Sequence, residues 1–257
     1  MTSQGVLWGL WDILIGPVTY RPIMEMAQSN LIGTLRRLPL FTDLTESELI
    51  LIAGRVTMRH LRPREIVFSE GDPCRELLIV RDGRVNLLKT AANGRQQLLS
   101  VERAGNSLSE ISVFDGDPYP ATAEAVTDTA LLRLEAEHFR KICLQHPEMA
   151  LKVIKVLGHR LRRMSSLIED LSFSTVRGRL VAYLGHLARE AGHRVSEGIE
   201  FELTENNEQL AARLGTVREL VSRNLGRLHN EGLVQMSRRT VRIPNLDALA
   251  EEIARSR

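Results

Sequence analysis

The sequence predicts an α+β fold: an antiparallel β jelly-roll barrel, then one long helix, then a compact C-terminal module of short helices and a hairpin. Three patterns predict it. Turn signals recur about every ten residues between positions 56 and 134, apolar residues follow a coiled-coil spacing between 154 and 171, and two capped helical segments meet at Gly215. The predicted boundaries are 1–28 for an N-terminal extension, 29–147 for the barrel, 148–173 for the long helix and 174–257 for the C-terminal module.

Composition already excludes several classes of protein. The chain has 257 residues, of which 43% are hydrophobic and 26% are charged, so it is neither disordered nor a disulfide-stapled miniprotein. Its formal net charge of +2 excludes a polycation that coats nucleic acid without selectivity. Cys74 and Cys143 form no C-x-x-C motif, which is typical of a reducing compartment, and we expect a cytoplasmic location.

The first 28 residues form the predicted N-terminal extension. Met24 and Met26 stand directly before the first helical pattern, so we expect residues 1–25 to be an over-extended start or a poorly ordered tail. In the alternative, the apolar stretch 6–18 is a plug for a partner or a membrane surface. That stretch is too short to span a bilayer and lacks the basic start of a secretory signal, so no membrane association is expected.

The barrel is predicted to follow a helical segment at 29–56. Residues 45–48 read Thr-Glu-Ser-Glu, the pattern of a capping box, ahead of an apolar run. Beyond this segment the sequence breaks into short β-rich pieces between Gly, Asp, Asn and Pro turns, including pieces at 77–80, 85–89 and 97–101. Strands at that spacing form an antiparallel barrel or jelly roll rather than alternating β and α units.

The long helix carries one narrow apolar stripe, made of Ile154, Leu157, Leu161, Met164, Ile168 and Leu171. Alternating spacings of three and four residues are typical of a coiled-coil seam, so these residues are predicted to form the interface of a homodimer. The alternative is an amphipathic helix that packs only on its own barrel. A break near 172–174 is expected to precede a second helix over 176–191.

The C-terminal module has the pattern of a winged helix-turn-helix. Asn206 is expected to cap a short helix with Gln209 at its N3 position, and Gly215 permits the tight turn that follows. Residues 216–219, Thr-Val-Arg-Glu, read as a second capping box that opens the next helix. A strand at 198–203, a hairpin at 233–244 and a polar helix from 245 complete the module.

The second helix of this module presents side chains suited to reading bases. Its apolar positions, Val221, Leu225 and Leu228, lie on one side, and the other side carries Arg218, Glu219, Ser222 and Arg223. Arg donates two hydrogen bonds to guanine, and Glu accepts one from cytosine. We therefore predict that these four polar residues contact bases, with Glu219 and Arg223 preorganised as an i,i+4 ion pair.

A basic surface surrounds that helix. Residues 209–244 carry seven Arg and two Glu. The DNA backbone is predicted to contact Thr216, Arg238, Arg239 and Arg242, the last three on the hairpin that would form the wing. The alternative is a set of solvated charges on an ordinary surface helix pair.

Over about residues 35–245 the chain resembles the Crp/Fnr transcription regulators. The resemblance rests on Phe-Thr-Asp-Leu at 41–44, on the turn glycines Gly71, Gly83 and Gly105, and on Arg-Glu-Leu-Val-Ser-Arg at 218–223. It implies a cyclic-nucleotide-binding-like barrel and a homodimer on a two-fold symmetric DNA site. The half-sites would contain a G-A step, TGTGA-like or TTGA-like. It also implies RNA polymerase as a partner.

The same resemblance locates an effector pocket at Ser109, Glu110, Ala121 and Thr122. Cyclic-nucleotide-binding members have a pattern similar to G-E-L followed by R-S-A, in which the Arg neutralises the cyclic phosphate and the Glu binds the ribose. Here Pro120 stands in place of that Arg. Cyclic AMP is therefore disfavoured, because its phosphate would lack a counter-charge. The alternative for Glu110 is a structural role, capping a turn or pairing with an arginine.

The sequence does not favour the family's other cofactors. No cysteine precedes Cys74, which argues against the iron–sulfur cluster of the Fnr type, and the potential heme ligands His60, His138 and His146 lie outside the cassette at 107–122. Cys74, next to Arg75, is either a structural residue or a thiol that senses oxidation. Control by abundance, with no effector, is a further alternative.

Enzyme motifs are absent from the sequence: it has no P-loop, G-x-G-x-x-G, G-x-S-x-G or H-E-x-x-H, and its seven histidines lack metal-ligand spacing. We therefore predict no enzyme and no metal site. The predicted function is that of a homodimeric, sequence-specific DNA-binding transcription regulator, controlled by an unidentified effector or by abundance. The alternative is a ligand-sensing module that acts through a protein partner, with the C-terminal module as a docking domain.

Overall fold

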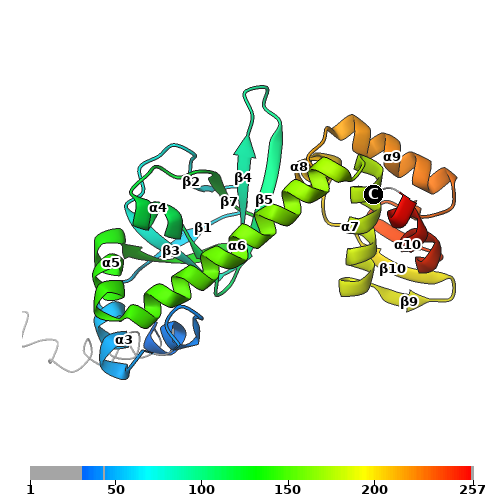
Figure 1. The fold of residues 1–257 in the computed structure, drawn as a ribbon. Helices are drawn as coiled ribbons and strands as arrows, with labels where there is room; N and C mark the ends of the chain where they lie inside the picture. The colour runs from blue at the N-terminus through cyan, green and yellow to red at the C-terminus, as the bar shows by residue number, and fades with distance from the viewer. Residues whose placement is uncertain (1–30, 43, 256–257) are drawn as a thin grey trace, which may run out of the picture.

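The computed structural model describes residues 31–42 and 44–255 as a barrel, a long helix and a C-terminal module (Figure 1). The predicted extension at 1–28, with both alternatives for it, lies outside the described residues. The single helical segment expected at 29–56 is wrong: residues 31–37 are helical, turns follow, and α3 spans Glu46–Ala53. Pro39 accounts for the break, because proline lacks the N–H that a continuing helix requires and disfavours helical geometry in the residue before it.

The capping box expected at 45–48 is confirmed. The Thr45 N–H donates to Glu48 Oε2 at 2.6 Å, and the Glu48 N–H donates to Thr45 Oγ1 at 3.5 Å. These two bonds satisfy backbone donors that the first turn of a helix leaves without a partner.

The barrel consists of two antiparallel four-stranded sheets, as the jelly-roll prediction requires. One sheet has the order β1-β8-β3-β6 and the other β2-β7-β4-β5. Its strands are β1 (Thr57–Leu61), β2 (Ile66–Phe68), β3 (Glu76–Asp82), β4 (Arg84–Thr90), β5 (Gln96–Arg103), β6 (Ser107–Leu108), β7 (Thr122–Ala125) and β8 (Thr129–Glu135). Leu78, Val80 and Leu131 are buried in the same core cluster as Phe68 and Tyr119, whose rings stack with centroids 3.8 Å apart.

Besides α3, the helices α4 (Glu110–Asp115), α5 (Ala136–Gln145) and α6 (Pro147–Phe173) adjoin the barrel. The sequence does not predict α4, which has only six residues, too few for a helical period to be visible. Ser109 precedes it with φ 69°, a left-handed conformation that is uncommon for a residue with a side chain.

The long helix α6 runs along the barrel from α5 toward the C-terminal module (Figure 1). Met149 and Val153 are buried against the barrel, whereas Ile154, Leu161 and Ile168 on the predicted seam are 62%, 69% and 64% exposed. The first pair fits the alternative of a helix packed on its own barrel, and Leu157 of the seam packs partly against the same core, but Ile154, Leu161 and Ile168 stay uncovered. The break expected near 172–174 is confirmed, because α7 (Val176–Ala191) begins after Thr175, whose side chain caps it.

The C-terminal module has its own core. Its elements are β9 (His193–Val195), β10 (Gly198–Glu202), α8 (Asn207–Leu214), α9 (Arg218–Asn230), β11 (Gln235–Ser237), β12 (Thr240–Ile243) and α10 (Leu246–Arg255). The sheet order is β11-β12-β10-β9, and the wing predicted at 233–244 is the β11–β12 hairpin. Leu180, Phe201, Leu210, Val221 and Val241 bring α7, the sheet and both helices of the helix-turn-helix into one cluster.

Arg177 joins three helices of this module. From α7 it donates through Nε to Glu252 of α10 at 2.5 Å and through both terminal nitrogens to Glu231, the residue after α9. The Arg177 guanidinium holds the pKa of Glu231 below its usual value. Because the folded pKa is lowered, this carboxylate contributes stability above its unfolded pKa, and the contribution is lost as pH falls through the folded pKa.

We expect Glu231→Gln to lower the free energy of unfolding at neutral pH, with a difference from the parent chain that shrinks below about pH 4. Urea unfolding across that pH range measures it. Glu251→Gln is the matched control, because Glu251 makes only an exposed i,i+4 pair with Arg255 at 3.1 Å. A pH-independent deficit in Glu231→Gln would contradict the prediction.

None of the helices in the described part of the chain has the length and apolar composition needed to span a bilayer.

Candidate nucleic-acid interface and sensor site

The first helix of the helix-turn-helix begins and ends as the sequence predicts. Asn206 Oδ1 accepts from the N–H groups of Glu208 and Gln209 at 3.0 and 2.9 Å, and Gln209 Oε1 accepts from the Asn206 N–H at 2.9 Å. Gly215 ends α8 with φ 65°, the left-handed conformation that favours glycine. A Cβ here would lie 2.5 Å from side-chain atoms of Gln97 and Leu171, so the turn also packs closely on β5 and α6.

The capping box predicted at 216–219 is wrong. Val217 is the N-cap of α9 and makes no side-chain cap, and Thr216 is only 5% exposed because it belongs to the buried turn, where its N–H donates to Ala211 O. The Thr216 hydroxyl is therefore not presented at the surface, and the predicted phosphate contact by this residue loses its basis.

The recognition helix α9 has one buried and one exposed side. Val221, Leu225 and Leu228 are buried in the core of the module. The four predicted base-reading residues, Arg218, Glu219, Ser222 and Arg223, are all exposed. Within the described residues their side chains make no hydrogen bond or ion pair, so the expected Glu219–Arg223 pair is not formed. All four side chains are free to bind a ligand.

The wing supplies two exposed cations rather than three. Arg238, with φ 55°, and Arg239 occupy the turn between β11 and β12, and both are exposed. Arg242 is half-buried, and its guanidinium pairs with Glu200 at 3.2 Å and with Glu197 at 3.7 Å. Its charge is already balanced by these two glutamates, whereas the prediction requires a free guanidinium for the DNA backbone.

The predicted effector pocket is occupied by the chain's own contacts. The Ser109 hydroxyl donates to Glu76 O at 2.9 Å, Ala121 is buried, and Thr122 Oγ1 accepts from the Glu70 N–H at 3.0 Å. Glu110 is fully buried: it accepts from the Ser107 hydroxyl and, at 2.6 Å, from Arg160 Nη1 of α6. The alternative in which Glu110 pairs with an arginine is confirmed.

A second buried carboxylate lies beside this site, and the sequence analysis missed it. Glu102 on β5 is 1% exposed and accepts from the Ser100 hydroxyl at 2.8 Å, from Asn106 Nδ2 at 2.6 Å and from Arg163 Nη2 at 3.3 Å. Strand periodicity does not reveal it, because a register shift between β4 and β5 pairs Leu87 with Ser100 but Leu88 with Leu98, which interrupts the alternation of faces along β5. A cavity of about 680 Å³ lies between α6 and this part of the barrel, lined by Glu102, Ser107 and Arg160 among others.

A lysine of β4 lies beside Pro120, which stands where the family has its phosphate-binding arginine. Lys89 Nζ donates to Pro120 O at 2.8 Å and pairs with Glu70 at 2.6 Å. Because Glu70 balances its charge, Lys89 does not supply the uncompensated positive charge that a bound phosphate requires.

Cys143 is buried in the core of the barrel, and His138 and His146 each lie beside a glutamate. Burial raises the pKa of Cys143 to about 11, which keeps its thiol protonated. His138 Nδ1 lies 3.2 Å from Glu135, and His146 Nδ1 lies 2.9 Å from Glu48, so both rings take part in surface contacts. The described residues contain no group of three or more His, Cys, Asp or Glu placed to hold a metal ion.

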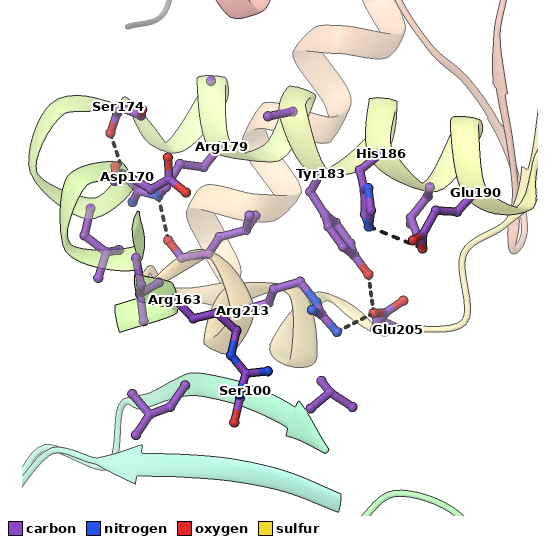
Figure 2. A pocket seen from close by; sticks show the side chains of 18 of the residues that line it. Ser100, Arg163, Asp170, Ser174, Arg179, Tyr183, His186, Glu190, Glu205 and Arg213 are labelled. Carbon is purple, nitrogen blue, oxygen red and sulfur yellow. Dashed lines mark hydrogen bonds and ion pairs between the residues drawn. The ribbon is translucent and has the colours of Figure 1, made fainter. Parts of the chain in front are cut away.

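A second cavity, also of about 680 Å³, separates the barrel from the C-terminal module (Figure 2). Arg213 lies over the Tyr183 ring, 4.7 Å from its centroid, and donates to Glu205 at 3.1 Å. The break between α6 and α7, at residues 174–175, is called the hinge below. Arg179 of α7 joins α6 to α8 at this hinge, because it donates to Asp170 O of α6 at 3.3 Å and to Leu214 O of α8 at 2.9 Å. The hinge therefore connects the long helix directly to the helix-turn-helix.

Comparison with known proteins agrees with this architecture. The cyclic nucleotide-binding domain family matches residues 58–146, and the Crp-like helix-turn-helix domain family matches residues 178–252. The cyclic AMP receptor protein of Thermus thermophilus is 33% identical over 84% of this chain and 96% of its own length. A CRP-like cAMP-activated global transcriptional regulator of Mycobacterium tuberculosis is 28% identical over 72% of this chain and 82% of its own length.

Solved structures agree as well. A CRP-family transcriptional regulator from Thermus thermophilus covers 76% of this chain and 96% of its own, with 27% identity and a TM-score of 0.61. A CooA mutant from Carboxydothermus hydrogenoformans covers 77% and 88%, with 26% identity and a TM-score of 0.63. The barrel, the long helix and the winged helix-turn-helix occur here in the order that these relatives share, and the chain belongs to the Crp/Fnr family of transcription regulators.

Proposed function

We propose that this regulator is a homodimer that binds a two-fold symmetric DNA site through the N-terminal half of α9. One observation carries the proposal: Arg218, Glu219, Ser222 and Arg223 are exposed together on the helix side opposite its buried residues, with no partner in the described part of the chain. A recognition helix needs such a row of free donors and acceptors to read base edges in a major groove. Arg238 and Arg239 supply backbone contacts from the wing.

The exposed seam of α6 supports the homodimer. Two parallel copies of this helix would cover Ile154, Leu161 and Ile168, which the protomer leaves open to water. The resulting two-fold axis would place two α9 helices on half-sites about one helical turn apart. We further propose RNA polymerase as a partner, on the family resemblance alone.

The proposed control is by abundance or by an effector that is not cyclic AMP. Two relatives are named for cyclic AMP, but here Pro120 replaces the phosphate-binding arginine and the Glu110 carboxylate is bound by Arg160. Both oxygens of this carboxylate already accept a hydrogen bond inside the chain, one from Ser107 and one from Arg160, so a ribose hydroxyl would have to share them.

Selection of bound sequences from a random duplex pool tests the proposal, with the purified chain at about 0.15 M salt, with and without cyclic AMP. We expect a two-fold G-A-containing motif in both conditions, with equal enrichment. Enrichment only with cyclic AMP would contradict the interpretation of Pro120 and Glu110. Failure of both conditions, with the protein folded, would favour the alternative in which the chain acts through a protein partner.

A further inference from the structure

We propose that Gly226 is a positioning residue of the recognition helix α9: because it has no side chain, the helix can enter a major groove deeply enough for the base-reading residues to reach the base edges. The inference rests on the proposed function, since it concerns how closely DNA approaches that helix. It adds to the interface a residue that supplies neither a hydrogen bond from a side chain nor a charge.

Helix formation does not account for a glycine at position 226. The residue is exposed and lies in the interior of α9, four residues before Asn230, where the helix ends. Glycine loses more conformational freedom on folding than any other residue, so alanine at an exposed position inside a helix makes the helix more stable.

The fold of the protomer does not account for it either. Gly226 has ordinary helical backbone geometry, unlike Gly215, whose φ is 65°. In the described part of the chain, a Cβ at Gly226 would have no atom within 4 Å outside its own stretch of helix. Gly185 of α7 differs, because a Cβ there would lie 3.4 Å from Leu249. The space over Gly226 is therefore open in the protomer.

This open space lies on the face of α9 that carries the base-reading residues. Gly226 follows Ser222 by four residues and Arg223 by three, and both spacings place residues on one face of a helix. At the rise of an α-helix, Gly226 lies about 12 Å beyond Arg218 along the axis, which is about the width of a major groove. The groove that receives Arg218 therefore also flanks Gly226.

The width of the helix limits how deeply it can enter that groove. An α-helix with its side chains is about 10–12 Å across, and a major groove is about 12 Å wide, so little space remains between them. A glycine lets a ligand approach the helix backbone closely at one point. A side chain at 226 would hold α9 away from the groove, and the base-reading side chains would then lie too far from the bases.

The variants that test the inference are Gly226→Ala and Gly226→Leu, and the matched control is Gly33→Ala. Gly33 is also helical, and a Cβ there would have no neighbour within 4 Å among the described residues, but it lies in the helical segment at 31–37, outside the C-terminal module. Thermal unfolding of the full chain without DNA measures stability. Titration against the selected duplex and an unrelated duplex of equal length measures affinity and specificity.

We expect both Gly226 variants to raise the midpoint of thermal unfolding by about 2–4 °C, because alanine and leucine are better helix formers than glycine. We expect them to bind the selected duplex roughly fivefold more weakly or worse, with the larger loss in Gly226→Leu, because added atoms in a close-packed contact force the two surfaces apart. The unrelated duplex, held mainly by charge, should lose less. Gly33→Ala should bind both duplexes as the parent chain does.

The expected signature is a gain in stability together with a loss of specific binding. Unchanged affinity of both Gly226 variants for the selected duplex would overturn the inference and leave the proposed function intact. A lower unfolding midpoint would do the same, because the glycine would then serve the fold. Equal losses on the two duplexes would contradict a role in the depth of insertion. A parent chain that selects no duplex would refute the proposed function, and the inference with it.

Discussion

Replacing Arg223 with alanine is expected to weaken binding to the preferred duplex by about 1–3 kcal/mol, roughly 5- to 150-fold, and to relax base preference at one position of each half-site. Arg223 is exposed on the solvent side of α9, and its side chain makes no hydrogen bond or ion pair within the described residues, so little of the fold depends on it. Competition titrations against duplexes with single base changes measure both effects. Equal losses on every duplex would contradict a base-reading role.

Arg239→Ala is the matched control for that experiment. Arg239 is also an exposed arginine of the same module, but it lies in the wing turn. A phosphate contact carries no sequence information, so its loss should weaken all duplexes alike and reduce the dependence of affinity on salt by about one phosphate contact. A sequence-selective loss in Arg239→Ala would assign the wing a reading role and contradict the predicted division between helix and wing.

The fold could be predicted wherever local chemistry alone decides the structure. The boundaries of α8 follow from Asn206 and Gly215, because a side-chain cap and a left-handed glycine act within a few residues. The start of α9 could not be predicted in this way. Thr216 has the right residue type for a cap, yet it is buried in the turn, and Val217 occupies the cap position without a side-chain bond. Whether a Thr caps a helix depends on how the preceding turn packs, which a motif does not record.

The sensor site could be predicted only in part, for a related reason. Glu110 was found because it lies in a recognisable cassette, and its pairing with an arginine was one of two alternatives. That Arg160 is the partner, 50 residues away in sequence, depends on how α6 lies on the barrel. Glu102 was missed because one acid in a half-polar strand looks like a solvated residue until the opposing helix is placed over it.

The largest effect is expected from charges on the seam of α6. In a parallel dimer, Leu161 and Ile168 would each face their own copy across the axis, so Leu161→Glu/Ile168→Glu would bury like charges against each other. We expect this variant to be a monomer and to lose roughly 100-fold or more in affinity for the two-fold site, because the second half-site no longer binds in an intramolecular step. Sedimentation equilibrium measures the mass, and titration of full-site and half-site duplexes measures the affinity.

The protomer should keep its fold in this variant, because both side chains are more than half exposed in the single chain. Lys155→Glu is the matched control: it also places an acid on an exposed position of α6, but outside the seam, where a charge costs little in a dimer. It should remain a dimer with unchanged affinity. A Leu161→Glu/Ile168→Glu chain that stays dimeric would place the interface elsewhere. A monomer that binds the full site as tightly as the parent chain would show that one recognition helix suffices and remove the need for two-fold symmetry in the target.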